Sequence, residues 1–199
     1  MPIDYREQLS LGEQAGYLWT WWKNDPLPLL SPLPGWHIET PEDLALLAKI
    51  GEIPVQDVEL RWQEGHRPFI AYQDATPVAY GWSALNNAVF GYPPVHFSVP
   101  ANNLYLYDFV TQPLWRGHGF YPRLLQEILL SEGKACERFW IIHQLANFAS
   151  QKGIARAGFR IAASVFHVNG GGLALIPDGN LELARVGADL LGLPLVGSR

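Results

Sequence analysis

The chain has 199 residues, of which 48% are hydrophobic and 17% charged, and its net charge is −5. This length and balance predict one globular domain with a sizeable core and argue against a disordered chain. The negative charge argues against nucleic acid or an anionic membrane as the main partner, and no apolar stretch is long enough to span a bilayer.

The cysteine and aromatic residues indicate the redox compartment and the kind of interior that the chain builds. The single cysteine, Cys136, excludes an internal disulfide and fits a reducing compartment. Residues 1–7 lack a cationic segment leading into an apolar run, so we expect no signal peptide and a cytoplasmic location. The eight Trp, eight Tyr and nine Phe residues predict either a heavily packed interior or an apolar acceptor pocket, and both alternatives stay open.

The first predicted element is an amphipathic helix over residues 9–22, where apolar side chains recur at roughly helical spacing. A proline-rich connector, residues 25–35, follows it, because proline fixes φ and lacks an amide donor. We therefore predict an N-terminal helical arm with its connector, residues 1–35, followed by a main domain, residues 36–199.

The main domain is predicted to alternate strands and helices. A helix is expected to start at Thr40, with Pro41 in its first turn. The other elements, in chain order, are a strand at 36–39, a helix at 55–63, strands at 69–72, 78–82 and 104–111, a helix around 124–129, a strand at 139–142, a helix at 147–157, paired strands at 161–168 and 173–176, and a helix at 181–191. This order predicts an α/β or α+β fold with a mixed sheet.

The most informative segment is residues 112–120, which follow a strand and open a helix. Gly117 and Gly119 let the backbone turn sharply and approach a ligand closely. The free amides at a helix start favour phosphate, and Arg116 adds a cation that can fork onto phosphate oxygens. The segment by itself fits either a phosphate loop or a plain strand-to-helix turn. It matches neither a dinucleotide fingerprint nor a Walker loop.

Two registered motifs resemble the GNAT acyltransferases. Residues 113–119 followed by Leu124-Leu125 look like the family's coenzyme A pyrophosphate loop, Arg/Gln-x-x-Gly-x-Gly/Ala, although Tyr121 stands where the family has a small residue. Residues 147–159 are similar to the family's late helix, with matching positions at Asn147, Ser150, Gly158 and Phe159. Residues 69–82 also look like the family's early hairpin, so the resemblance covers about residues 36–168.

This resemblance implies a mixed, mostly antiparallel central sheet flanked by helices. It implies an N-acyltransferase that moves an acetyl or other acyl group from acyl-CoA, without a metal, to an amine of a small molecule or peptide. The residues that it assigns to coenzyme binding are Phe109, Val110, Thr111, Arg116, Gly117, His118, Gly119, Phe120, Tyr121, Asn147 and Ser150. The alternatives are a catalytically silent acyl-CoA-binding or interaction domain and a structural domain without a coenzyme site. The oligomeric state, a homodimer included, is left open.

Two residues are candidates for the base that takes a proton from the amine. Asp108 is expected on the same strand face as Leu104, Leu106 and Val110, where apolar neighbours would raise the pKa of its carboxyl. The alternatives are a solvent-facing side chain or one paired with a basic residue. His143 ends the next strand, and imidazole is the natural base near neutral pH. Its alternative is a cap or core histidine. We expect Asp108 and His143 to border one cleft.

The group that protonates the leaving thiolate is not evident. In many GNAT enzymes this group is a Tyr seven residues after the helix Asn, but that position holds Ile154 here. The substitutes that the sequence offers, without a ranking, are Tyr105, Tyr107 and Tyr121. Cys136 lies in a polar link without an obvious partner, so a thiol nucleophile is not expected. The six histidines show no metal-ligand spacing.

Overall fold

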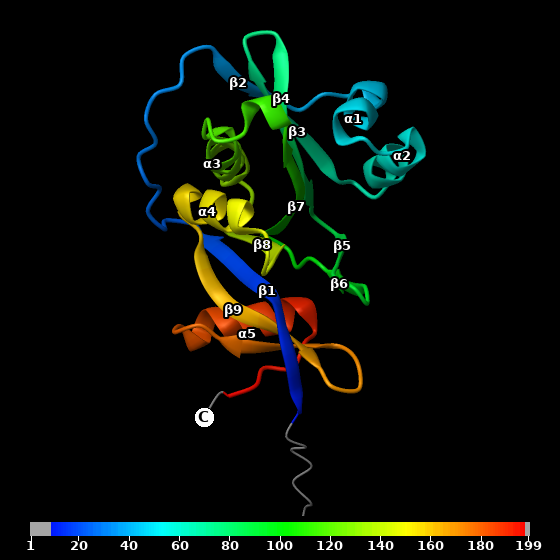
Figure 1. The fold of residues 1–199 in the computed structure, drawn as a ribbon, viewed down its shortest axis with the longest axis vertical. Helices are drawn as coiled ribbons and strands as arrows, with labels where there is room; N and C mark the ends of the chain where they lie inside the picture. The colour runs from blue at the N-terminus through cyan, green and yellow to red at the C-terminus, as the bar shows by residue number, and fades with distance from the viewer. Residues whose placement is uncertain (1–8, 198–199) are drawn as a thin grey trace, which may run out of the picture.

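The computed structural model describes residues 9–197, which build one large sheet with helices on both faces (Figure 1). Within this part of the chain the large sheet has eight strands in the order β10-β9-β1-β8-β7-β4-β3-β2, and β5 and β6 form a separate hairpin. The strands are β1 (Leu11–Trp22), β2 (Trp36–Glu39), β3 (Arg67–Gln73), β4 (Thr76–Ala84), β5 (Asn87–Phe90), β6 (Val95–Ser98), β7 (Asn103–Thr111), β8 (Arg138–Gln144), β9 (Arg160–Val168) and β10 (Leu173–Pro177). Only β7 and β8 pair in parallel, so the expected mixed, mostly antiparallel sheet is confirmed.

The helices cover the two faces of the sheet in three groups. On one face lie α3 (Phe120–Glu132) and α4 (Phe148–Ala157), preceded by a short 3-10 turn, η1 (Pro113–Trp115). The other face carries α1 (Leu44–Gly51) and α2 (Val55–Gln63) over β3 and β4, and α5 (Leu181–Leu191) over β9 and β10. Tyr107 of β7 packs against both of these last two clusters, which places them on the same face. No helix among residues 9–197 is long and apolar enough to cross a membrane.

The predicted N-terminal helix is wrong, because Leu11–Trp22 is a strand between β8 and β9. Its side chains alternate between two buried layers: Trp19 and Trp21 face α3 and α4, whereas Leu18 packs in the cluster of α5. A strand that is buried on both faces is apolar at most positions, so its pattern cannot be told from helical spacing. Residues 1–8 of the predicted arm lie outside the described residues.

The proline-rich connector after β1 is confirmed as an irregular segment, and it crosses the α3–α4 side of the molecule on its way to β2 (Figure 1). Arg123 of α3 donates hydrogen bonds to the carbonyls of Gly119 and Ser31. Gln126 donates to the carbonyl of Pro28. These bonds fasten the connector to the helix that follows the glycine turn.

Most other elements agree with their predictions, with two differences. The helix expected from Thr40 starts later, because its N-cap is Asp43, whose carboxylate accepts hydrogen bonds from the amides of Ala45 and Leu46. Asp is among the strongest N-cap residues, so it defines the first turn. The β5–β6 hairpin was not predicted.

A bulge at Asp108 determines which way the end of β7 faces. Tyr80 of β4 pairs with Val110 and Trp82 pairs with Tyr107, so β7 carries one extra residue between these pairs. Asp108 adopts φ 54°, a left-handed conformation that Asp tolerates better than most residues. Because the bulge resets the alternation, Phe109 packs toward α3 and α4, on the side where Leu104 and Leu106 also lie. The expected alternation of Asp108 with these two leucines is therefore wrong.

The parallel strands β7 and β8 separate before they end. Their pairing runs from Asn103–Arg138 to Leu106–Ile141 and stops there, although β7 continues to Thr111 and β8 to Gln144. The backbone edges of the two strands beyond Leu106 and Ile141 consequently face each other without a ladder. This gap lies beside the glycine turn and the start of α4.

Candidate functional site

A cavity of about 580 Å³ lies where the end of β7, the glycine turn and α4 meet. Its walls include ten of the eleven residues assigned to coenzyme binding from the sequence: Phe109, Val110, Thr111, Arg116, Gly117, Gly119, Phe120, Tyr121, Asn147 and Ser150. The eleventh, His118, is not on the wall. Its ring Nδ1 bonds the carbonyl of Arg116, and its ring lies against that of Trp115. The structure thus brings together two motifs separated by about 30 residues of sequence.

The glycine turn is shaped for close approach of an anion. Gly117 and Gly119 adopt φ values of 81° and 80°, which side-chain-bearing residues rarely reach, and Gly119 is the N-cap of α3. The first amides of a helix have no acceptor within the helix, so those at the start of α3 point into the turn. The partial positive charge of the helix start adds to them.

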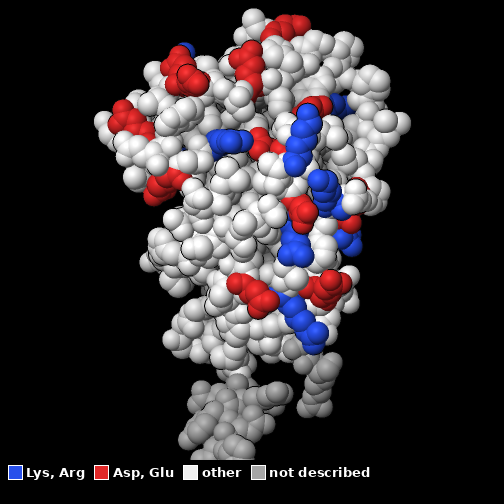
Figure 2. All heavy atoms as spheres, turned by 180° about the vertical axis from the view of Figure 1, so that it is seen from behind, with Lys and Arg blue, Asp and Glu red and all other residues white. Residues whose placement is uncertain are grey.

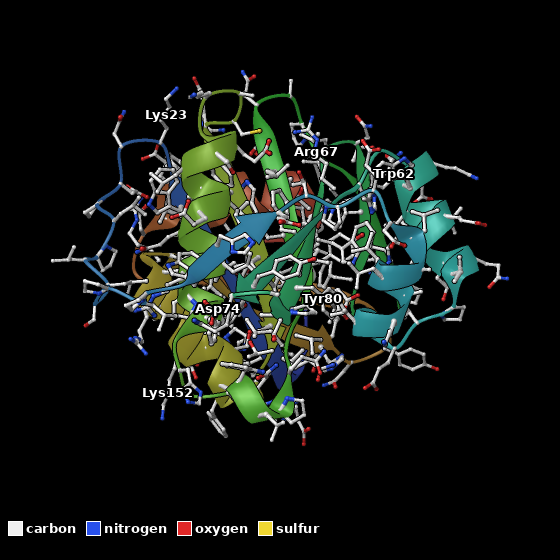
Figure 3. All side chains as sticks on the ribbon, turned by 90° about the horizontal axis from the view of Figure 1, so that it is seen from above. Lys23, Trp62, Arg67, Asp74, Tyr80 and Lys152 are labelled. Carbon is white, nitrogen blue, oxygen red and sulfur yellow. The ribbon has the colours of Figure 1, made fainter. Side chains whose placement is uncertain are left out.

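Three cations surround this turn. Arg116, Lys152 and Arg156 line the cavity, and no Asp or Glu does. The Nε of Arg116 donates to the carbonyl of Thr111 at 3.1 Å, which holds the guanidinium beside the end of β7. Figure 3 shows Lys152 projecting from α4 at the edge of the molecule. The cavity is therefore matched to a ligand with several negative charges.

Sequence reasoning missed Lys152 and Arg156. Both lie on the face of α4 that contains Ala149 and Gly153, and all four residues line the cavity. Residues three and four apart share a helix face, so the signal was a pair of basic residues at i and i+4 after the Asn147–Ser150 motif.

Tyr121 occupies the position where the family has a small residue, yet it does not close the turn. Its ring lies against Phe109, with a centroid separation of 5.4 Å, and packs under Gly153 of α4. Its hydroxyl is 3.2 Å from the hydroxyl of Ser150. Burial raises the pKa of the Tyr121 phenol, and the bond to Ser150 opposes this rise only in part. The phenol is therefore a protonated donor on the cavity wall.

Asn147 has a structural role that the sequence did not predict. It is the N-cap of α4, and its Oδ1 accepts the amide of Ser150 at 3.0 Å. It lines the same cavity as Val110 and Thr111, so it lies near the end of β7 as expected. That the Asn147 side chain faces a coenzyme arm stays a prediction.

A second cavity, of about 720 Å³, lies on the other side of the end of β8. It is bounded by the start of β1, the β5–β6 hairpin, Tyr105 of β7, the end of β8 and strands β9 and β10. His143 borders this cavity, and Phe148, the residue next to Asn147, borders it too. The two cavities therefore approach each other at the start of α4.

His143 is buried, with 5% of its surface exposed, and its ring lies against those of Tyr17 and Trp19 at centroid distances of 5.7 and 5.9 Å. Its Nδ1 donates to the carbonyl of Gln144, because a carbonyl can only accept, so the neutral ring carries its lone pair on Nε2. Among the described residues, Nε2 has no hydrogen-bond partner. Burial lowers the pKa of His143, so the ring is neutral near pH 7.

Asp108 is paired with a basic residue, one of the alternatives that the sequence left open. Its Oδ2 is 2.6 Å from Nη1 of Arg61 on α2, and that guanidinium lies over the rings of Trp82 and Tyr107. Asp108 lines neither of the two cavities, whereas His143 borders the larger one. The expectation that Asp108 and His143 share one cleft is therefore wrong.

The structure also shows where the other residues considered for the chemistry lie. Ile154 is fully buried in the core between α3, α4 and the sheet, so the family's tyrosine position does not face either cavity. Tyr107 is hydrogen-bonded to His66. Cys136 is 2% exposed, and burial raises the pKa of its thiol. No cluster of three or more potential metal ligands occurs among residues 9–197.

The family model described as Acetyltransferase (GNAT) family matches residues 33–159, more than half of the chain. The chain therefore belongs to this family, as its two registered motifs indicated.

Solved structures confirm the fold. A GNAT-family acetyltransferase from Colwellia psychrerythraea aligns with a TM-score of 0.54 and 18% identity, over 77% of this chain and 55% of that one. A GCN5-related N-acetyltransferase from Kribbella flavida aligns with a TM-score of 0.51 and 11% identity, over 89% of this chain and 62% of that one. The ribosomal-protein-S18-alanine N-acetyltransferase from Escherichia coli aligns with a TM-score of 0.51 and 15% identity, over 69% of this chain and 88% of that one. The chain thus spans little more than half the length of the first two. No match is found among curated proteins.

Proposed function

We propose that this chain transfers an acyl group from acyl-CoA to an amine acceptor. The observation that carries the proposal is the 580 Å³ cavity, in which a glycine turn, a helix start and three cations converge at the point where β7 and β8 separate. Coenzyme A carries a pyrophosphate and a further phosphate on one end and its thioester on the other. The cavity offers cations at the turn and uncharged walls toward the strands.

Each part of the coenzyme has a matching part of the cavity. The pyrophosphate fits the free amides at the start of α3, with Arg116 as a forked donor, and Lys152 and Arg156 neutralise the remaining phosphate charge. The pantetheine arm fits the edge of β7 at residues 109–111, whose backbone on the β8 side has no strand partner. Peptide-like amides of the arm can complete these hydrogen bonds as an added strand would.

The reaction forms a C–N bond and breaks the C–S bond of the thioester. The amine must lose a proton and the departing thiolate must gain one. His143, whose neutral ring carries an unpartnered lone pair on the buried Nε2, is the stronger candidate base, since the carboxylate of Asp108 is paired with Arg61. Tyr121 is the candidate acid, because it is the one of the three substitute tyrosines that lines the coenzyme cavity. No metal takes part in this scheme.

One specific observation favours a second candidate function. The family's tyrosine position is filled by Ile154, which faces the core. A catalytically silent domain that binds acyl-CoA would need the cavity but no acid. Such a domain shares every contact of the coenzyme with an active enzyme and differs only in turnover.

Two measurements test the proposal. Calorimetric titration with CoA should show binding that is lost in a Gly119→Val variant, because a side chain at φ 80° distorts the turn. Release of free thiol from acetyl-CoA in the presence of amines should exceed the rate without amine. Binding without amine-dependent thiol release would establish the silent domain, and absence of binding would overturn both candidate functions.

The class of acceptor and the location of the protein are also proposed, from its surface charge and its cysteine content. On the face shown in Figure 2, basic and acidic side chains alternate down one side, acidic side chains predominate at the upper part of the other side, and no broad basic patch is seen. This pattern supports a small-molecule or peptide acceptor over nucleic acid or a membrane surface. A cytoplasmic location remains a proposal based on the single cysteine.

A further inference from the structure

The 720 Å³ cavity differs from the coenzyme cavity in its charge. None of its wall residues is Asp, Glu, Lys or Arg, whereas the coenzyme cavity has three cations. Its polar wall residues include Gln14, Gln144 and His167, whereas the ring of His143 lies against Trp19 and its Nε2 is buried. A ligand that enters it finds hydrogen-bonding groups but no counter-ion.

The remaining walls are apolar or aromatic. Phe90 and Tyr92 come from the β5–β6 hairpin, Tyr105 from β7, and Val165 and Leu173 from β9 and β10. Tyr92 and Phe148 are 90% and 65% exposed, so large rings stand at the open edge of the cavity. Exposed apolar surface around a cavity of this size is typical of a site for a small organic molecule.

Strand β1 supplies one wall of this cavity, through residues 14–16. Gly16 crosses His143 so closely that a Cβ at position 16 would lie 2.1 Å from the His143 carbonyl oxygen. Gln14, two residues earlier, donates to the carbonyl of Gly16 and borders the cavity. The position of Gln14 is therefore determined by the close contact between β1 and β8.

The cavity ends beside the proposed site of acyl transfer. Ile142 and His143 on its wall belong to the part of β8 that has separated from β7, and Phe148 adjoins Asn147 on the wall of the coenzyme cavity. An amine held here would point toward the gap between the strands, where the thioester of a bound coenzyme would lie.

Resting on the proposed function, we infer that the acceptor is a primary amine with an uncharged, largely apolar body, which this cavity binds as the neutral amine. Burying a charge without a counter-ion is costly, so each additional ammonium group on an acceptor weakens its binding. The cavity therefore selects against polyamines and basic peptides. It favours an aromatic or branched aliphatic body that fills the space between Tyr105 and the hairpin.

The test compares 2-phenylethylamine with spermidine as acceptors in the acetyl-CoA thiol-release assay. We expect kcat/KM for 2-phenylethylamine to be at least about tenfold higher, the effect of one uncompensated buried charge after partial hydration. Equal values, or a preference for spermidine, would overturn the inference. The proposed function would survive that result, because thiol release would still occur.

A charge variant makes the test specific to this cavity. Gln14→Glu adds one carboxylate of the same shape to the wall and should reduce the preference for 2-phenylethylamine over spermidine by about threefold or more. Gln56→Glu makes the same change on exposed α2, away from the cavity, and should leave the preference unchanged. Equal preferences in wild type and Gln14→Glu would contradict the inference.

Binding is measured separately, so that the result does not depend on turnover. Calorimetric titration of 2-phenylethylamine into the CoA-loaded chain should show binding, and spermidine should bind at least about tenfold more weakly. If 2-phenylethylamine does not bind, the inference fails even where CoA binds. If CoA itself does not bind, the proposed function fails, and titration of 2-phenylethylamine into the free chain decides the inference.

Discussion

The ring of Tyr121 lies directly against the backbone of Gly153, where a Cβ atom would stand 2.2 Å from Cδ1 of the ring. The first helix turn after the glycine loop and the middle of α4 are thus fitted to each other. The large residue that departs from the family pattern is accommodated because the facing helix has no side chain at that point.

Gly153→Ala should therefore destabilise the protein, although alanine is the better helix former. Replacing Gly by Ala in a helix normally raises the free energy of unfolding by about 1 kcal/mol. Here the overlap of the new methyl group with Tyr121 should instead lower it by about 1–3 kcal/mol. In a Tyr121→Ala background the same change should be neutral or stabilising. Urea denaturation of the four proteins measures the coupling. Additive effects would show that the two residues do not contact each other.

Arg116→Ala should weaken CoA binding by about 1.5–3 kcal/mol, the loss of a charge-assisted hydrogen bond to phosphate. Arg156→Ala should weaken it as well, because Arg156 reaches the same turn from α4. Arg185→Ala, at an exposed position of α5 across the sheet, is the matched control. Calorimetric titration gives the dissociation constants of the wild type and of the three variants. An unchanged value for Arg116→Ala would remove this residue from the site.

The pH dependence of the reaction should identify the base. The lowered pKa of His143 keeps its ring neutral at pH values where an ordinary histidine is protonated, and protonation at still lower pH would remove the lone pair. His143→Gln should lower kcat by about 10²–10⁴ and abolish the acid limb of the pH–rate profile. Asp108→Asn should retain that limb, because its carboxylate is paired with Arg61. Full activity and an unchanged profile in both variants would exclude both residues as the base.

His66 should make the stability of the fold depend on pH. Burial lowers its pKa in the folded state, although the bond to the Asn87 carbonyl and the charge of Glu64 oppose this. The unfolded chain then binds a proton first, below about pH 6.5. The free energy of unfolding should be highest above that pH, and it should fall as the pH drops toward the pKa that His66 has in the folded state.

Thermal or urea unfolding between pH 5 and pH 8, a range of about 3 units around the ordinary histidine pKa, tests this dependence. His66→Gln should flatten the decline below about pH 6.5. His37→Gln replaces an exposed histidine and should leave the decline as it is. A wild-type stability that stays constant or rises on acidification would contradict the expected role of burial.

Local patterns were sufficient for the elements whose signals lie within a few residues. The helix 55–63, the helix 181–191 and the hairpin around Asn169–Gly172 depend on turn residues and helical periodicity, and the structure has them as predicted. The glycine turn is of the same kind, because Gly117 and Gly119 determine their own backbone conformation. The resemblance to the GNAT family rests on such short motifs.

Three features escaped prediction because distant parts of the chain create them. Residues 11–22 form a strand because they pair with β8 on one side and with β9 on the other, and both strands lie more than 100 residues away in the sequence. The bulge at Asp108 depends on the register against β4. The role of Gly81 is equally hidden, since a Cβ there would lie 2.1 Å from the ring of Phe109.

The sequence by itself determined the family, the glycine turn and the order of most elements, because short-range dihedral preferences and helix ends are local properties. The tertiary structure alone decided that Asp108 is paired with Arg61, that the Nε2 of His143 is buried without a hydrogen-bond partner among the described residues, and that a second cavity, with no Asp, Glu, Lys or Arg on its wall, lies beside His143. These properties depend on burial and on the distance between charges. Both are determined only when strands and helices far apart in the sequence pack together.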